Sequence, residues 1–113
     1  SEKPVLVDFF ATWCGPCKML SPILREVKDS LGDTVSIIKI DVDKNQQISS
    51  KYQVRGVPTM ILFQNGKQLW RQSGVLTKEE IIKTIIEKTV RNRFCFANNY
   101  LETTATFSTA TDF

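Results

Sequence analysis

The chain has 113 residues, a net charge of +3, three cysteines and no histidine. This length suits one domain with a single hydrophobic core, and the 42% hydrophobic and 24% charged content is ordinary for a soluble globular protein. The 15 basic residues are dispersed, and no apolar run approaches the roughly 20 residues of a membrane span. The sequence therefore argues against nucleic acid or a membrane as a partner, and we expect no signal peptide.

The first expected strand is the apolar run from Val5 to Phe10, which is interrupted only by Asp8 and is typical of a strand covered on both faces. A helix is expected from about Pro16 to Leu31, because Pro is favoured at a helix start and apolar residues then recur at helical spacing. Gly32 should end this helix, and Pro22 inside it should produce a kink.

The rest of the pattern predicts a buried strand over residues 35–42, a short helix over 45–52, and two strands over 59–64 and 67–73. Asn65-Gly66 is typical of the two-residue turn of a hairpin. Thr77 begins the last helix, and Glu80 completes a capping box three residues later. The buried stripe of that helix is expected to consist of Ile81, Ile82, Ile85, Ile86 and Val90.

This order of elements predicts the fold class. The first two crossovers favour parallel strands and the hairpin adds an antiparallel pair, which gives a mixed sheet with helices on both faces, an α/β sandwich of three layers. Residues 1–90 are expected to form this domain. Residues 91–113 are expected to form a poorly specified tail, since residues 103–111 are almost all Thr, Ala and Ser.

Cys14-Gly15-Pro16-Cys17 is the motif that carries chemistry. A thiolate, not a thiol, attacks a disulfide. Cys14 should lie at the helix N-terminus, where unpaired backbone N–H groups and the helix dipole favour the thiolate form. Cys17 should lie one turn inside the helix and be more shielded. We therefore predict that Cys14 attacks a target disulfide and that Cys17 resolves the resulting mixed disulfide.

Other uses of these cysteines are weaker. A static disulfide across so short a loop would constrain the unfolded chain little. A structural zinc site normally needs four Cys or His ligands, which this chain cannot supply, so we predict no metal; a cluster shared between two chains is the remaining alternative. Cys95 carries no signal beyond that of a stray thiol in the tail.

Asp8 is the second informative residue, because a carboxylate inside a buried apolar run is costly without a partner or a task. Desolvation should raise its pKa, and it could accept the Cys17 proton, through a water, as that thiol attacks. Lys39, in the adjacent apolar strand, is the natural charge partner. From the residues alone, a purely structural Asp8–Lys39 couple is as well supported as a proton relay.

Several residues near the motif carry open alternatives. Trp13 either shields the disulfide and contacts partners or simply packs. Gly56 and Gly74 either permit close approach to the site or serve ordinary turns. Only about 5–6% of X–Pro bonds in folded proteins are cis, so the residues alone favour a trans bond before Pro58.

One set of motifs follows a known order and spacing along residues 5–88. The set consists of Val7-Asp8-Phe9, Trp13-Cys14-Gly15-Pro16-Cys17-Lys18, Pro22, Lys39 with Asp41, Gly56-Val57-Pro58-Thr59, Asn65-Gly66 and Gly74. In these motifs the chain resembles the thioredoxin family, in its bacterial style.

The resemblance implies a general protein-disulfide reductase. It implies that Cys14 attacks, that Cys17 resolves, and that Asp8, aided by Lys39, is the buried acid. It implies a cis Pro58 that faces the cysteines and shapes a groove for an extended target segment, which overrides the trans expectation. The same surface would be lined by Trp13, Gly15, Pro16, Gly56, Val57 and Gly74.

The chain departs from the family pattern at both ends. Family members have a strand and a helix before the segment that matches Lys3-Pro4-Val5, so their lack here should expose a sheet edge. The segment after Thr89 extends past the usual end; either its aromatic residues cover that edge, in the same or a neighbouring chain, or it is an unnatural extension. Phe10, where many relatives carry Trp, is a conservative change.

The resemblance also implies partners. These are disulfide-containing target proteins and a flavoprotein thioredoxin reductase that returns electrons from NADPH, with no bound cofactor besides the reversible Cys14–Cys17 disulfide. We expect roles in electron transport and cell redox homeostasis, a cytoplasmic location, and a monomer or a strand-exchanged dimer. The rivals are an oxidase or isomerase, and a non-catalytic interaction module with the same fold.

Overall fold

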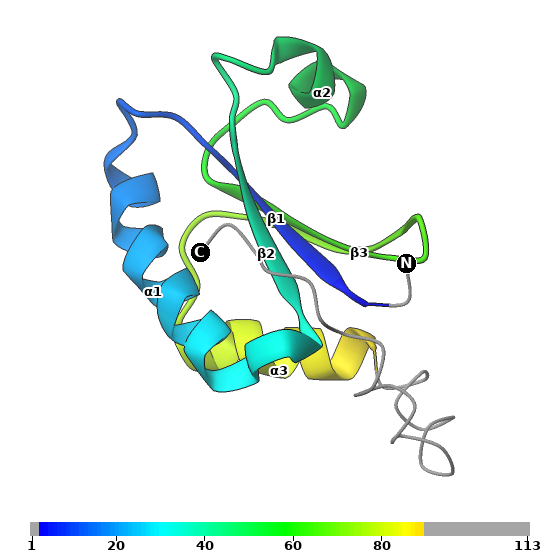
Figure 1. Ribbon diagram of the computed structural model, residues 1–113. Coiled ribbons are helices and arrows are strands. Elements are labelled where there is room, and N and C mark those ends of the chain that lie inside the picture. Colours follow the sequence, from blue (N-terminus) through cyan, green and yellow to red (C-terminus); the bar gives the residue numbers. More distant parts are fainter. Residues whose placement is uncertain (1–2, 90–113) are drawn as a thin grey trace, which may run out of the picture.

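The structure is a computed structural model that describes residues 3–89, and residues 1–2 and 90–113 lie outside that description. Figure 1 shows the elements in chain order. They are β1 (Val5–Phe10), α1 (Gly15–Leu31), a 3-10 turn (Gly32–Thr34), β2 (Ser36–Asp41), α2 (Gln46–Lys51), β3 (Thr59–Gln64), β4 (Lys67–Ser73) and α3 (Lys78–Lys88). All seven predicted helices and strands are present. The ends of the first six differ from the predictions by one residue or none, and α3 begins one residue after Thr77 and ends at Lys88, before Val90, the last residue of its predicted stripe.

Local signals account for where these elements begin and end. Gly32 takes a positive φ of 58° at the end of α1, a conformation that glycine adopts without steric cost. Asn65 and Gly66 both have positive φ, 56° and 78°, as the predicted hairpin turn requires. The Thr77 side chain accepts from the Glu80 backbone and the Glu80 side chain accepts from the Thr77 backbone, so the predicted capping box is confirmed.

The four strands form one mixed sheet in the order β2-β1-β3-β4. β1 pairs parallel with β2 and antiparallel with β3, and β3 pairs antiparallel with β4. The first crossover is therefore parallel as predicted, but the prediction of a parallel strand after the second crossover is wrong. The connection through α2 stays beyond the end of β2, so the chain enters β3 from the end of the sheet at which β2 leaves it. The central position of β1 explains its nearly continuous apolar sequence. In the register, Asp8 lies beside Lys39 on β2 and beside Met60 on β3.

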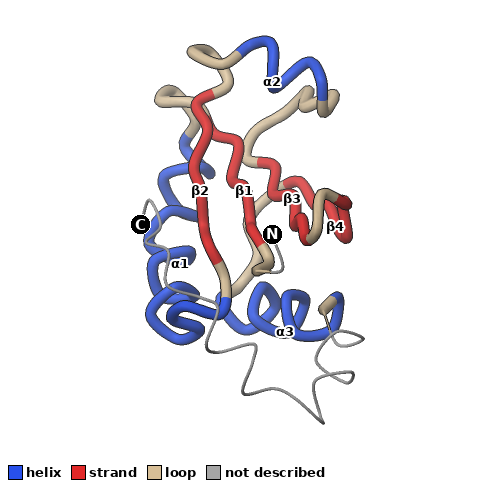
Figure 2. Tube along the Cα trace, turned by 45° about the vertical axis from the view of Figure 1, so that its right-hand side comes forward, coloured by secondary structure: helices blue, strands red, loops and turns tan. Residues whose placement is uncertain are grey.

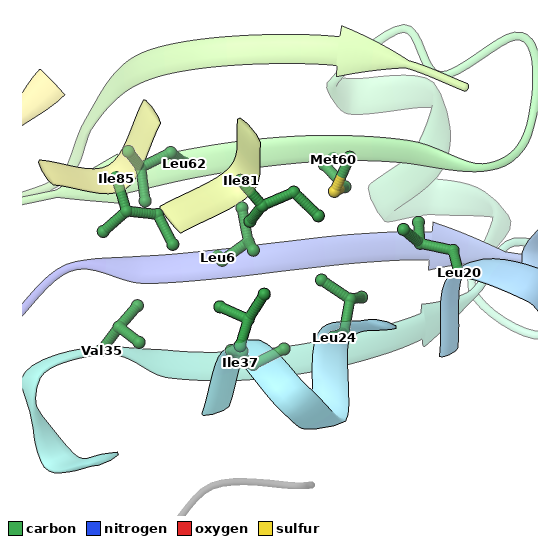
Figure 3. Close-up of a cluster of buried hydrophobic side chains, with 10 residues drawn as sticks. Leu6, Leu20, Leu24, Val35, Ile37, Met60, Leu62, Ile81 and Ile85 are labelled. Carbon is green, nitrogen blue, oxygen red and sulfur yellow. The ribbon is translucent and has the colours of Figure 1, made fainter. Parts of the chain in front are cut away.

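Helices α1 and α3 pack together on one face of this sheet (Figures 1 and 2). The main core lies between them and the strands, and Figure 3 shows how its side chains interdigitate. Its fully or nearly buried members are Leu6, Leu20, Leu24, Val27, Val35, Ile37, Met60, Leu62, Ile81 and Ile85.

The opposite face carries a smaller apolar cluster of Val7, Phe9 and Ile61. Tyr52 and Val54, from the segment directly after α2, pack against it. Helix α2 itself stands beyond the end of β2, away from α1 and α3 (Figure 2). The predicted mixed α/β architecture is confirmed, and the coverage of the two faces is unequal.

Two expectations on α3 need comment. Ile81 and Ile85 are buried and Ile82 packs partly buried against the main core as predicted, whereas Ile86 is 37% exposed, so the buried stripe is narrower than expected. Val90, the tail over residues 91–113 and Cys95 lie outside the described residues. None of the helices within residues 3–89 combines the length and the apolar character that a membrane span requires.

Candidate active site

The Cys14–Cys17 pair lies at the start of α1, directly after β1. The two residues form a disulfide, with their Cα atoms 5.3 Å apart. Cys14 is the N-cap of α1, and its Sγ accepts a hydrogen bond from the Cys17 backbone N–H at 3.1 Å. Backbone N–H groups of a first helical turn have no partner within the helix, so this sulfur occupies the place of a capping oxygen and would be stabilised there as a thiolate.

Exposure does not distinguish the two cysteines as we expected. Cys14 is 4% exposed and Cys17 is 5% exposed, so the greater shielding predicted for Cys17 is not observed in the disulfide form. Their surroundings do differ. Cys14 Sγ lies 3.7 Å from the Val57 carbonyl oxygen, in the loop before β3, whereas Cys17 lines a groove on the side of β2.

The loop that faces Cys14 is fixed by backbone contacts. The Val57–Pro58 peptide bond is cis, as the family resemblance implies, and the expectation of a trans bond from the residues alone is wrong. The Pro58 carbonyl accepts a hydrogen bond from the Gly74 N–H at 2.9 Å. The Thr59 hydroxyl donates to the Gly56 carbonyl at 2.7 Å. These contacts bring Gly56, Pro58 and Gly74 together, and Val57 joins them to Cys14.

Trp13 lies on the surface beside Cys14. Its side chain is 69% exposed, so it does not pack in the core, and its indole N–H donates to Asp43 Oδ2 at 2.8 Å. Gly15 and Pro16, in the first turn of α1, are also exposed. The predicted target-binding residues on α1 therefore reach solvent around a nearly buried disulfide.

Asp8 is fully buried on β1. It lies two residues after Leu6, so the two side chains share the strand face that packs against α1 in the main core. Neither of its carboxylate oxygens has a hydrogen-bond partner among the described residues. Burial raises the pKa of Asp8 from 3.8 to about 6, and the positive charge of Lys39 moderates that rise. This supports the expected direction of the pKa shift.

Lys39 is next to Asp8 in the strand register, but it does not hydrogen-bond to that carboxylate. Its ammonium group donates to Ser21 Oγ at 3.0 Å and lies 4.7 Å from the centre of the Phe10 ring. Lys39 therefore affects Asp8 as a nearby positive charge and forms no hydrogen bond with its carboxylate.

A groove of about 490 Å³ opens on the same side. It is lined by Phe10, Ala11, Thr12, Cys17, Lys18, Ser21, Pro22, Arg25 and Lys39. The groove does not include Trp13 or Pro58. Cys17 therefore lines the groove, whereas Cys14 faces the loop that contains Pro58. Residues 3–89 contain no cluster of acidic and cysteine side chains that could hold a metal ion.

Some residues at this site were not found from the sequence. Ser21 accepts a hydrogen bond from Lys39, and Asp43 accepts one from Trp13. Arg71 on β4 donates to the carbonyls of Tyr52 and Gln53, just before the loop that contains Pro58. No motif marks these three residues, since each acts through a partner 18 or more positions away in the chain.

Comparison with known proteins bears on this geometry. The family model described as thioredoxin matches residues 1–87. The chain belongs to the thioredoxin family. Family membership and the Cys14–Cys17 pair together support a thiol–disulfide oxidoreductase whose redox group is the disulfide itself.

Relatives and solved structures agree with the family. Chloroplastic thioredoxin Y of Oryza sativa subsp. japonica is 51% identical over 85 residues, which cover 75% of this chain and 51% of that protein. Chloroplastic thioredoxin Y2 of Arabidopsis thaliana is 47% identical over the same shares. The structure of a mutant thioredoxin from Halobacterium salinarum NRC-1 has a TM-score of 0.72 at 40% identity, covering 78% of this chain and 76% of that one. The chain spans about half the length of the plant relatives.

These names correct one expectation. We predicted a cytoplasmic location, and that prediction is wrong, because the relatives with 47–51% identity are chloroplastic proteins.

Proposed function

We propose that this protein is a protein-disulfide reductase in which the two cysteines have different roles. The observation that carries the proposal is the asymmetry of the disulfide. Cys14 Sγ caps α1 and faces the Val57-Pro58 loop, whereas Cys17 lines the groove that also contains Lys39. An attacking sulfur needs a stabilised thiolate and access to the target, and the position of Cys14 suits both needs.

The first step forms a mixed disulfide. The Cys14 thiolate attacks one sulfur of a target disulfide, the target S–S bond breaks, and the second target sulfur leaves as a thiolate that takes a proton. In the second step the Cys17 sulfur attacks Cys14 Sγ, the mixed disulfide breaks, and the first target sulfur leaves in turn. Two electrons have then moved from the dithiol to the target, and the Cys14–Cys17 disulfide has formed.

Asp8 is proposed to accept the Cys17 proton during the second step. A base is needed because Cys17 must lose its proton as it attacks, and a carboxylate whose pKa is raised to about 6 accepts a proton near neutral pH far better than an ordinary one. Asp8 faces α1 and lies beside Lys39, which lines the same groove as Cys17. Lys39 is proposed to tune the charge of Asp8.

An extended target segment is proposed to lie over Cys14, between Trp13 and the loop at Pro58. Exposed Trp13, Gly15, Pro16 and Gly56 would contact it, with Val57, Pro58 and Gly74 forming the floor. Oxidised protein would be reduced again by a flavoprotein thioredoxin reductase that uses NADPH. The match over residues 1–87 supports residues 1–90 as the redox domain, and the names of the plant relatives support a plastid location.

The test uses the full chain and two single variants. Wild-type protein should reduce a disulfide-containing protein when a dithiol supplies electrons. Cys17→Ser should abolish turnover and accumulate a mixed disulfide through Cys14, detected by mass spectrometry, while Cys14→Ser should form none. An inactive wild-type chain, or a Cys17→Ser variant that traps nothing, would contradict the proposal and favour a non-catalytic binding module.

A further inference from the structure

The side chain of Lys39 contacts Ser21 on α1 and the ring of Phe10 at the end of β1. Its ammonium donates to Ser21 Oγ at 3.0 Å and lies over the Phe10 ring at 4.7 Å from the centroid. Asp8 is the neighbour of Lys39 in the strand register, yet both of its oxygens lack a hydrogen-bond partner among residues 3–89. A half-buried cation beside a buried carboxylate would ordinarily bond to it.

We propose that Ser21 is a positioning residue for the dithiol chemistry: by accepting a hydrogen bond from Lys39, its hydroxyl holds the ammonium group away from the Asp8 carboxylate. Ser21 lies four residues after Cys17, so the two side chains share one face of α1 and line the same groove. The proposal rests on the proposed role of Asp8 as the proton acceptor.

Among the charged groups around Asp8, Lys39 is the one that affects the pKa of its carboxyl group. From β2 the facing charge is Lys39, and from β3 the register neighbour is Met60, which carries none. From α1 the groove that contains Lys39 also receives Cys17, Lys18 and Arg25, and the residues that α3 packs against this core are apolar. Among the charged groups of residues 3–89, Lys39 is the one whose charge opposes the effect of burial on the Asp8 pKa.

The position of the ammonium group sets how strongly Asp8 holds a proton. If Lys39 bonded directly to Asp8, the ionised carboxylate would be stabilised and its pKa would fall, which would make it a weaker base for the Cys17 thiol. With Lys39 bonded to Ser21, the pKa of the carboxylate stays at about 6, and the nearby ammonium group still partly offsets its negative charge. Ser21 would therefore keep the proton acceptor basic enough to work.

The experiment measures the Asp8 carboxyl directly, by a carbon-detected NMR pH titration of the full chain in its disulfide form. In Ser21→Ala the apparent pKa of Asp8 should fall by about half a unit, because Lys39 is released toward the carboxylate. Ala is also the better helix former, so α1 should not be weakened. Ser21→Thr keeps a hydroxyl and should titrate as the wild type, as should Ser30→Ala, an exposed serine on the same helix.

A second pair of variants tests whether the effect passes through Lys39. In a Lys39→Met background, Ser21→Ala should no longer shift the Asp8 titration. The pH profile of disulfide reduction should show the matching change, with the acidic limb of Ser21→Ala moved to lower pH by about the same half unit.

The outcomes separate this proposal from the proposed function. An unchanged or raised Asp8 titration in Ser21→Ala, or a fall that persists in Lys39→Met, would overturn the role of Ser21. If instead Asp8→Asn keeps the wild-type pH profile of reduction, the proton-acceptor role of Asp8 is wrong, while the titration still decides whether Ser21 positions Lys39.

Discussion

The Gly74 backbone N–H donates a hydrogen bond to the Pro58 carbonyl at 2.9 Å, which ties the end of β4 to the loop in front of β3. Gly74 has a φ of +96°, a conformation that side chains rarely adopt. The contact places a positive-φ position directly under the loop that faces Cys14. The requirement for glycine there comes from backbone conformation, since among the described residues only Gly74 itself and its two chain neighbours come within 4 Å of where a Cβ would be.

Replacing Gly74 by Ala should therefore lower the free energy of unfolding by about 1–2 kcal/mol, the cost of a positive φ in a residue with a Cβ. Because the backbone must shift to relieve that strain, the KM for a protein disulfide should rise more than kcat falls. Urea unfolding and steady-state kinetics measure the two effects. Gly56→Ala is the stability control, since Gly56 has open space and no positive φ. Equal stability losses in the two variants would contradict the argument.

The elements of the fold could be predicted because their signals are local. The Asn65-Gly66 turn and the Thr77–Glu80 capping box depend on residues that touch within four positions, and both occur as predicted. The burial of β1 on both faces also followed from its sequence. The parallel pairing of β1 with β2 and the antiparallel pairing of β3 with β4 followed from chain connectivity, but the antiparallel direction of β3 relative to β1 did not.

The details of the site could not be predicted, because they depend on contacts between distant residues. Lys39 and Asp8 were expected to pair, and adjacency in the register was correct, but the hydrogen bond of Lys39 goes to Ser21, a residue that no pattern marks. The position of Trp13 was likewise open, since its indole bonds to Asp43, thirty positions along the chain. The cis bond before Pro58 could be predicted only from the family resemblance, because local preference favours a trans bond.

The raised pKa of Asp8 predicts a pH-dependent stability. The unfolded chain loses the Asp8 proton near pH 3.8, while the folded protein keeps it up to about pH 6. The free energy of unfolding should therefore fall as pH rises through this window, by about 3 kcal/mol for a shift of this size. The free energy of unfolding of Asp8→Asn should not fall in this window. The difference between this variant and the wild type should therefore grow from near zero below pH 4 to about 3 kcal/mol above pH 6.

Urea unfolding of the disulfide forms at about pH 4 and pH 8 measures this difference. Asp29→Asn, an exposed position on α1, is the matched control and should differ from wild type by less than about 0.5 kcal/mol at both pH values. A stabilisation by Asp8→Asn that is the same at both pH values would mean that burial of the charge is not its cause.

Arg71 should control the mobility of the segment that leads to Pro58. Its guanidinium group on β4 donates to the carbonyls of Tyr52 and Gln53, and Gln53 has a positive φ of 55°. Arg71→Met removes both bonds and should lower the free energy of unfolding by about 1–2 kcal/mol. Amide hydrogen exchange over residues 52–58 should become faster, while exchange in α1 and α3 should change only with global stability.

Two variants qualify the role of Arg71. Arg71→Lys keeps the charge but not the two-pronged geometry, so it should recover only part of the protection. Gln68→Ala, exposed on the same strand, should leave exchange over residues 52–58 unchanged. Uniformly faster exchange across the sheet in Arg71→Met would indicate a general loss of stability and no specific control of this segment.

The Trp13–Asp43 hydrogen bond should orient the target-binding surface without stabilising the fold. Trp13 is 69% exposed, so breaking the bond with Asp43→Ala should change the free energy of unfolding by less than about 0.5 kcal/mol. The indole should gain rotational freedom, which lowers its fluorescence anisotropy in a Trp70→Phe background where it is the sole tryptophan. The KM for a protein disulfide should rise severalfold with little change in kcat, because orienting a side chain contributes to binding. Asp43→Asn keeps an acceptor oxygen and should behave as the wild type. An equal rise in KM for both variants would mean that the negative charge of Asp43 causes the effect, and that the hydrogen bond to Trp13 does not.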